Sequence, residues 1–300
     1  MMKNVKNAVA HRVSGRLPRG EFWIGTNIFA ERKIEDDINA HVVFCLEMGM
    51  DFISVPVGRS GSSELGYRIF NPSEIRDATE SGLFVVAVIS GPFQRIVDEK
   101  GLGLVLADIA GDTLGIRKAI EREANTVNSL LQACMDGGAN AVMIAEDIAF
   151  DSGSFFSPTM LHDIFQPLYS EFVDNIHHRG GFAVFHSCGN FTNFMPDIVS
   201  SKFDGLSCQV ECLDILLLKQ TFGARITLFT GISREFLDNT SLSAKQKQQF
   251  SQIVTELGVN GGFVLSSSSG LNSTDMVSRM IKLYALADKA WDRPQRIETQ

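Results

Sequence analysis

Eight short apolar runs alternate with longer stretches of helical periodicity, and no other feature of this chain constrains its fold as strongly. The runs cover residues 22–26, 52–57, 84–90, 141–147, 182–188, 205–211, 226–232 and 262–268. Most are continuously apolar, which is typical of parallel strands covered on both faces. Parallel strands need crossover connections, and apolar residues recur at helical spacing in 33–49, 112–137, 158–179, 193–201, 213–221, 244–258 and 274–290.

This order of strands and helices predicts a single (β/α)8 barrel, of the TIM type, over residues 1–300. The chain has 300 residues, of which 44% are hydrophobic, so it can bury a large core. No linker or change of composition marks a second domain. The segment 91–111 is an additional excursion after the third strand.

Net charge, apolar runs and cysteine content exclude several classes of protein. The formal net charge of −8 argues against a nucleic-acid or anionic membrane surface, because phosphate binding depends on clustered Lys and Arg. No run of 18 apolar residues and no signal-peptide pattern is present, so we expect a soluble, cytoplasmic protein with small-molecule ligands. The five cysteines are too few and too scattered for a disulfide framework.

Chemistry in such barrels takes place where the strands end, at their carboxyl side. The polar groups expected at these ends are Asn27, Glu146, Asp147, His186, Cys188, Asn190, Glu211, Cys212, Ser268 and Ser269. His186 and Cys188 stand two residues apart on one strand, so both side chains point to the same side. Imidazole and thiolate together suit zinc, whereas the alternative is plain packing, because Cys is among the most buried residue types.

Several motifs together resemble the uroporphyrinogen decarboxylase superfamily, in particular its corrinoid-dependent methyltransferase branch. They are "GPF" at 91–93, "GANAVMIAEDIAFDSGSFFSPTML", "HSCGN", "FDGLSCQVE" at 203–211 and "GGFVLSSSSGL". The resemblance covers nearly the whole chain, and the family fold is a (β/α)8 barrel, in agreement with the strand count.

In the methylcobamide:coenzyme M methyltransferases of that branch, a His-x-Cys pair and a later cysteine hold zinc, and a glutamate is able to occupy a fourth position. The resemblance therefore implies that His186, Cys188 and Glu211 are metal ligands. The later cysteine is replaced by serine, either Ser268 or Ser269, so the site is weak, differently completed or lost. Cys212 is a local substitute, ranked below Glu211 because neighbouring strand residues point to opposite sides.

The implied activity is methyl transfer from a methylcorrinoid, carried on a partner corrinoid protein, to a small acceptor. With a thiol acceptor such as coenzyme M, zinc would lower the thiol pKa. With tetrahydrofolate as acceptor, Glu146 and Asp147 would bind the pterin, and we take both, with Glu211, as candidate catalytic residues. Their alternatives are a helix-capping or solvated pair and, for Glu211, a rim carboxylate in an ion pair.

Four further residues are candidates for substrate binding: Asn27, Asn190, Ser268 and Ser269. The serine run leads into a helix, where backbone N–H groups often bind an oxyanion such as a sulfonate, although a polar capping loop is the alternative.

Two other functions stay open at this stage. One is uroporphyrinogen decarboxylation without a cofactor, although "RLPRGEFWIGT", with Arg16 and Arg19, lacks the arginine-rich signature of those enzymes. The other is a non-catalytic barrel that binds a tetrapyrrole or corrinoid.

Overall fold

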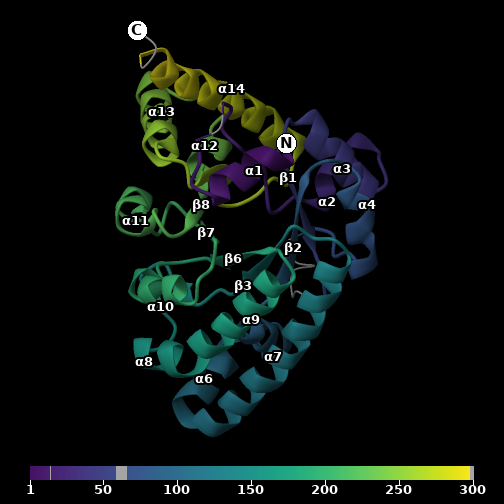
Figure 1. Cartoon of the computed structure of the whole chain (residues 1–300), viewed down its shortest axis with the longest axis vertical. Coiled ribbons are helices and arrows are strands. Elements are labelled where there is room, and N and C mark those ends of the chain that lie inside the picture. The colour runs from purple at the N-terminus through teal and green to yellow at the C-terminus, as the bar shows by residue number, and fades with distance from the viewer. Residues whose placement is uncertain (14, 59–65, 298–300) are drawn as a thin grey trace.

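The computed structural model describes residues 1–13, 15–58 and 66–297 and contains a curled parallel sheet surrounded by helices (Figure 1). Seven parallel strands form this sheet, in the order of their sequence. They are β1 (Phe52–Pro56), β2 (Phe84–Ser90), β3 (Ala141–Ala145), β6 (Phe182–Ser187), β7 (Gly205–Cys208), β8 (Thr227–Ile232) and β9 (Phe263–Ser267). Seven of the eight expected strands are thus confirmed, each within a few residues of its predicted bounds.

The expected first strand, 22–26, is wrong as a regular strand. Residues 18–25 instead make isolated contacts with both neighbours: Gly20 N–H donates to Leu265 O (3.1 Å), Gly25 N–H donates to Leu271 O (2.7 Å), and Asp51 N–H donates to Arg19 O (2.7 Å). Pro18 has no N–H to continue a ladder, and a side chain on Gly20 would overlap the Phe52 ring. In the described residues, the sheet therefore has seven strands with one irregular segment beside it, and the predicted eight-stranded barrel is not confirmed.

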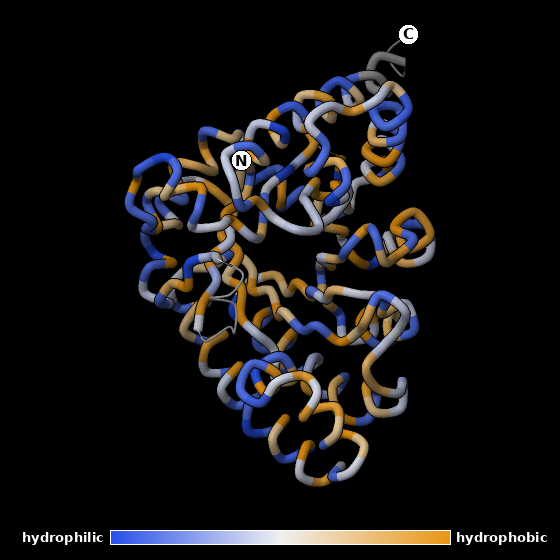
Figure 2. Tube along the Cα trace, turned by 180° about the vertical axis from the view of Figure 1, so that it is seen from behind, coloured by the Kyte–Doolittle hydropathy of each residue, from blue (hydrophilic) through white to orange (hydrophobic). Residues whose placement is uncertain are grey.

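Two hydrophobic clusters lie on opposite faces of the curled sheet. The inner one contains Phe52, Phe84 and Phe229 and is joined by Val5 and Ala8 of α1 (Met2–Val9). The outer one is much larger and joins the strands to the surrounding helices. All strand residues of β1, β2, β8 and β9 are buried, which explains their continuously apolar sequences, and hydrophobic colouring follows the strands in Figure 2.

The crossover helices follow the predicted ranges closely. The main ones are α3 (Ile38–Glu47), α7 (Thr113–Asp136), α9 (Gln166–His178), α10 (Met195–Ser200), α11 (Ile215–Phe222), α13 (Ala244–Gly258) and α14 (Thr274–Ile297). α13 and α14 lie together at one end of the molecule, and α6, α7 and α9 lie at the other (Figure 1). The predicted helix 158–179 is divided, because α8 (Pro158–Met160) and a π-helical turn at 161–165 precede α9.

Shorter elements bound the carboxyl ends of the strands. The excursion after β2 forms α5 (Pro92–Lys100) and α6 (Leu102–Gly111), and a small hairpin of β4 (Ala149–Phe150) and β5 (Gly153–Ser154) follows β3. α2 (Thr26–Arg32), α4 (Ile75–Thr79) and α12 (Arg234–Asp238) complete the helices that the structure describes, together with 3-10 turns at 72–74 and 192–194. None of the described helices is both long and apolar enough to cross a bilayer.

Candidate metal centre

His186 and Cys188 lie at the carboxyl end of β6 on the same side, as the sequence predicts. Cys188 Sγ is 3.8 Å from His186 Nε2. Asp147, just beyond β3, completes a group of three, whose donor atoms all lie within 4.8 Å of one another. The register explains this meeting, because Ala145 of β3 pairs with His186 and so places Asp147 beside Cys188.

Hydrogen bonds orient two of the three donors, His186 and Asp147. His186 Nδ1 and the Ser207 hydroxyl are 2.9 Å apart, which leaves Nε2 turned toward Cys188. The Cys188 N–H donates to Asp147 Oδ1 at 2.8 Å and fixes that carboxylate beside the thiol. Partners of this kind are what hold metal ligands in register in known sites.

The protonation states also suit a metal site. Burial lowers the pKa of His186, so the ring is neutral and able to bind a cation at neutral pH. Burial, and after it the Asp147 carboxylate, raises the pKa of the Cys188 thiol. Because a metal ligand must lose its proton, a bound cation would release the proton of Cys188.

The donor set fits zinc. Nitrogen, sulfur and carboxylate oxygen are the three donor types of zinc sites, and ligand distances of about 2.0–2.3 Å place neighbouring donors of a tetrahedral ion roughly 3.3–3.8 Å apart. The separation of 3.8 Å between Cys188 Sγ and His186 Nε2 matches that spacing.

The β4–β5 hairpin holds the loop that carries Cys188. Asn190 N–H donates to Phe150 O at 2.7 Å, and Ile148 N–H donates to the Ser187 hydroxyl at 3.2 Å. Gly189 has a left-handed backbone (φ 76°), and a side chain there would overlap the carbonyl of Ala149. The close approach of hairpin and loop therefore requires glycine at this position.

The structure does not bring Glu211 to the pair. Its carboxylate accepts a hydrogen bond from the Arg234 N–H (2.5 Å), at the start of α12. The expectation that it faces His186 assumed a strand through 211, whereas β7 ends at Cys208 and the strand alternation is lost beyond it. The carboxylate beside the His-x-Cys pair is Asp147.

Glu146 is a helix cap within the outer layer. Its side chain is fully buried and accepts hydrogen bonds from Phe93 N–H (3.2 Å), Gln94 N–H (2.8 Å) and the Tyr169 hydroxyl (3.3 Å). Burial raises its pKa to about 8. In this structure Glu146 caps α5 and has no exposed surface from which to contact an acceptor, so its expected catalytic or pterin-binding role stays a prediction.

The four candidates for substrate binding have ordinary local roles. Asn190 Oδ1 accepts from the Thr192 N–H (3.2 Å) and hydroxyl (2.8 Å), and Asn27 lies exposed in the first turn of α2. The Ser268 hydroxyl donates to Ile232 O at 3.1 Å, and Ser269 is exposed. None of the four side chains belongs to the described donor cluster.

Trp23 and Tyr67 were missed by the sequence reading, and Ser266 was expected at the end of the last strand without a role of its own. The Trp23 ring meets His186 edge-on with 5.5 Å between ring centroids, and it packs on Tyr67 at 5.1 Å. Ser266 is fully buried on β9, and its hydroxyl has no hydrogen-bond partner among the residues that the structure describes. It lies two residues after Val264 of the inner cluster and so faces the same side of the sheet. The only signal for Trp23 in the sequence is its place within the first apolar run, and Tyr67 lies outside every predicted strand and helix.

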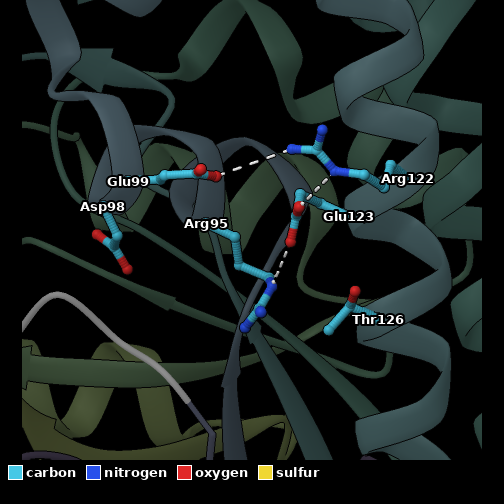
Figure 3. A pocket seen from close by; sticks show the side chains of 6 residues that line it. All are labelled: Arg95, Asp98, Glu99, Arg122, Glu123 and Thr126. Carbon is cyan, nitrogen blue, oxygen red and sulfur yellow. Dashed lines mark hydrogen bonds and ion pairs between the residues drawn. The ribbon is translucent and has the colours of Figure 1, made fainter.

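A pocket of about 340 Å³ lies between α5 and α7 (Figure 3). Four of its charged lining residues pair with one another, with Arg95 Nε 2.9 Å from Glu123 and Arg122 Nη2 3.8 Å from Glu99. This pocket is therefore bounded by an ion-pair network and is not the metal centre.

Comparison with known proteins identifies a matching family and solved structures of similar fold. A family model described as "Uroporphyrinogen decarboxylase (URO-D)" matches residues 65–284. No curated protein sequence matches the chain.

Solved structures resemble the fold over almost the full length. A methyltransferase from Methanosarcina mazei is 14% identical, with a TM-score of 0.75, and the match covers 96% of this chain and 98% of that one. A B12-independent methionine synthase from Shewanella sp. W3-18-1, in complex with selenomethionine, is 11% identical with a TM-score of 0.60 and coverage of 96% and 98%. D-psicose 3-epimerase from Clostridium cellulolyticum H10, with D-tagatose, is 10% identical with a TM-score of 0.54 and coverage of 93% and 98%.

Proposed function

Because this chain belongs to the uroporphyrinogen decarboxylase family, we propose that it is a methyltransferase of that family which uses zinc at Asp147, His186 and Cys188. The observation that carries the proposal is the gathering of these three donors within 4.8 Å at the carboxyl ends of β3 and β6. The similarity of fold to the Methanosarcina mazei methyltransferase supports it.

The reaction we infer moves a methyl group from a methylcorrinoid to a small thiol acceptor. Zinc bound at the site would lower the pKa of the acceptor thiol and hold it as a thiolate at neutral pH. The chain itself supplies a neutral His186, positioned by Ser207, and an Asp147 carboxylate fixed by the Cys188 N–H. The corrinoid contributes the reactive methyl bond, and we place it on a separate corrinoid protein.

The site favours a thiol acceptor over tetrahydrofolate. A pterin needs polar groups that hold its ring, and Glu146, the first candidate for that role, is buried under α5. Asp147 is engaged with Cys188. Thiol activation, in contrast, uses the donors that are present.

Trp23 and Tyr67 form the apolar wall of the proposed acceptor site. Both rings are half-buried, and Trp23 contacts His186 directly. Such a wall excludes water from one side of the donors and so strengthens the electrostatic interactions made there. The unpartnered Ser266 hydroxyl offers a hydrogen bond on the same face of the sheet.

Uroporphyrinogen decarboxylation is disfavoured by the positions of Arg16 and Arg19. Arg16 pairs with Asp51 (2.5 Å), immediately before β1, and Arg19 pairs with Asp288 (3.0 Å). Asp51 marks the amino end of the strands, opposite to the donor cluster. Neither arginine is placed to bind the carboxylates of a substrate at the carboxyl ends.

The test combines metal analysis with an activity screen. Purified protein should hold zinc at one ion per chain and transfer methyl from methylcobalamin to a thiol. Cys188→Ala and His186→Ala should lose both the zinc and the transfer, whereas His178→Ala, an exposed histidine at the end of α9, should keep them. Protein that binds no zinc under any condition and transfers no methyl would refute the proposal.

A further inference from the structure

Cys212 lies in the turn after β7, on the same rim as the donor cluster. Its sulfur lies 3.3 Å from Asp151 Oδ1 and 3.5 Å from Gln209 Oε1, so the thiol can donate its one hydrogen to either oxygen. The same Gln209 oxygen accepts the Gly189 N–H at 3.1 Å, and that N–H also interacts with the Cys212 sulfur. Cys212 is therefore in contact with the residue that directly follows Cys188.

No other cysteine of the chain is placed to add a thiolate. Cys45, Cys134 and Cys208 are buried, whereas Cys188 and Cys212 are the two with partly exposed thiols. Cys45 lies on α3 and Cys134 on α7, both within the outer hydrophobic cluster.

The serine run does not offer an equivalent ligand. The Ser268 hydroxyl is held between Ile232 O and the Val210 N–H. A serine hydroxyl is also a far weaker ligand for zinc than a thiolate, because the hydroxyl keeps its proton at neutral pH. A fourth position of a tetrahedral site is thus left to water, to the acceptor or to a thiol from the rim.

We propose that Cys212 is the second thiolate of the zinc site and joins Asp147, His186 and Cys188 in place of the serine run, with the Asp147 carboxylate as the ligand that an acceptor thiol would displace. A change of its χ1 rotamer moves the sulfur by roughly 3 Å, which frees it from Asp151, and its contact with the Gly189 N–H already places it beside the loop that carries Cys188. The turn that carries it is half-exposed and is bounded by the hydrogen bond from Cys212 N–H to Gln209 O (3.4 Å), so this change requires no rearrangement of the sheet. This inference rests on the metal site of the proposed function.

Two thiolates change which cation the site selects. One nitrogen, one carboxylate and one sulfur form a mixed set, whereas a second sulfur makes the set soft and favours zinc over magnesium or manganese. Deprotonated Cys212 also has no hydrogen to donate, so its contact with the Asp151 carboxylate is lost when it binds the ion.

The experiment counts thiolates with cobalt(II) in place of zinc. The near-ultraviolet sulfur-to-cobalt charge-transfer absorption increases with each bound thiolate, so Cys212→Ser should lose about half of it, as should Cys188→Ser. Zinc affinity, measured by competition with a chromophoric chelator, should fall about tenfold or more in Cys212→Ser. Cys134→Ala, which removes a thiol far from the site, should leave the absorption and the affinity unchanged.

The outcomes separate this inference from the proposed function. If Cys212→Ser keeps the full absorption and affinity while Cys188→Ser loses them, Cys212 is not a ligand and the metal site still stands. If the unaltered protein binds neither cobalt nor zinc, both proposals fail. Thermal unfolding of each variant without metal shows whether a loss of binding is a loss of fold, and Cys212→Ala provides a second substitution in the same exposed turn.

Discussion

The buried carboxyl of Glu146 predicts a large and pH-dependent change in stability when this residue is replaced. Replacement by Ala removes the acceptor for Phe93 N–H, Gln94 N–H and the Tyr169 hydroxyl. A buried donor without a partner costs about 1–3 kcal/mol, and loss of a helix cap costs about 0.5–2 kcal/mol. Since these contributions overlap, we expect Glu146→Ala to lower the free energy of unfolding by roughly 3–5 kcal/mol.

The pH dependence of this effect has a definite sign. Burial raises the pKa of Glu146 from 4.5 to about 8, so between these values the folded chain holds a proton that the unfolded chain has released. Stability from this group is therefore complete below pH 4.5 and is lost as the pH rises to about 8. The difference between the two pKa values corresponds to roughly 5 kcal/mol.

Glu146→Gln separates the two effects. The amide keeps the shape of the side chain and one acceptor oxygen but carries no charge, so the variant should lack the part of the pH dependence that belongs to residue 146. Urea unfolding of the apoprotein at pH 5, 7 and 9 measures this difference, with the unaltered protein as reference. Equal pH slopes for both proteins would refute the assignment.

The same variant tests the catalytic interpretation of Glu146. Because the side chain is buried under α5, Glu146→Gln should keep methyl transfer at a pH where the protein is folded. A folded variant with zinc bound and no transfer would mean that this carboxyl acts in the reaction and that its burial is relieved during turnover.

Three further predictions follow from single positions. Burial raises the pKa of the Glu21 carboxyl to about 7, so the unaltered protein should lose roughly 3 kcal/mol of stability between pH 4.5 and about 7, and Glu21→Gln should lack this loss. Urea unfolding across this pH range checks the prediction, and an unchanged dependence of the unfolding free energy on pH counts against it. Gly189→Ala should unfold at lower temperature and bind zinc more weakly, because its side chain would overlap the Ala149 carbonyl. Gly101→Ala is the control: this residue also has a positive φ, but a side chain there would meet no neighbour, so zinc binding should stay intact. Trp23→Ala should raise the KM for the thiol acceptor while zinc content stays constant, and Trp23→Phe should restore most of the affinity; an unchanged KM in Trp23→Ala would remove Trp23 from the acceptor site.

Strand prediction succeeded where burial on both faces dictates the sequence, and it failed where a buried polar side chain takes part in the fold. Residues 22–26 are apolar enough to suggest a strand, but just before them the Glu21 carboxylate binds the N–H and hydroxyl of Ser267 and the Tyr284 hydroxyl. These contacts hold the segment against β9 without a continuous ladder. Hydrophobic periodicity carries no information about such a contact between residues almost 250 positions apart.

The relative positions of the candidate ligands were predicted correctly within one strand and only partly across strands. The pairing of His186 with Cys188 depends on a period of two along β6, which the sequence shows directly. The arrival of Asp147 beside them depends on the register between β3 and β6, which periodicity leaves undetermined. The sequence therefore identified this carboxylate without identifying its partner.

How far a residue lies beyond the end of its strand decides whether strand alternation still predicts the side that its side chain faces. Ala145 joins the inner cluster, so alternation sends Glu146 outward and Asp147 inward, and both positions agree with the structure although they lie one and two residues beyond β3. Glu211 lies three residues beyond β7, past the turn that begins at Val210, and there the backbone no longer alternates. The same turn places the Cys212 sulfur, and not the Glu211 carboxylate, against the Cys188 loop. A serine in the place of the family cysteine is thus compatible with a complete zinc site, provided that a thiol reaches the ion from this turn, and the cobalt experiment measures whether it does.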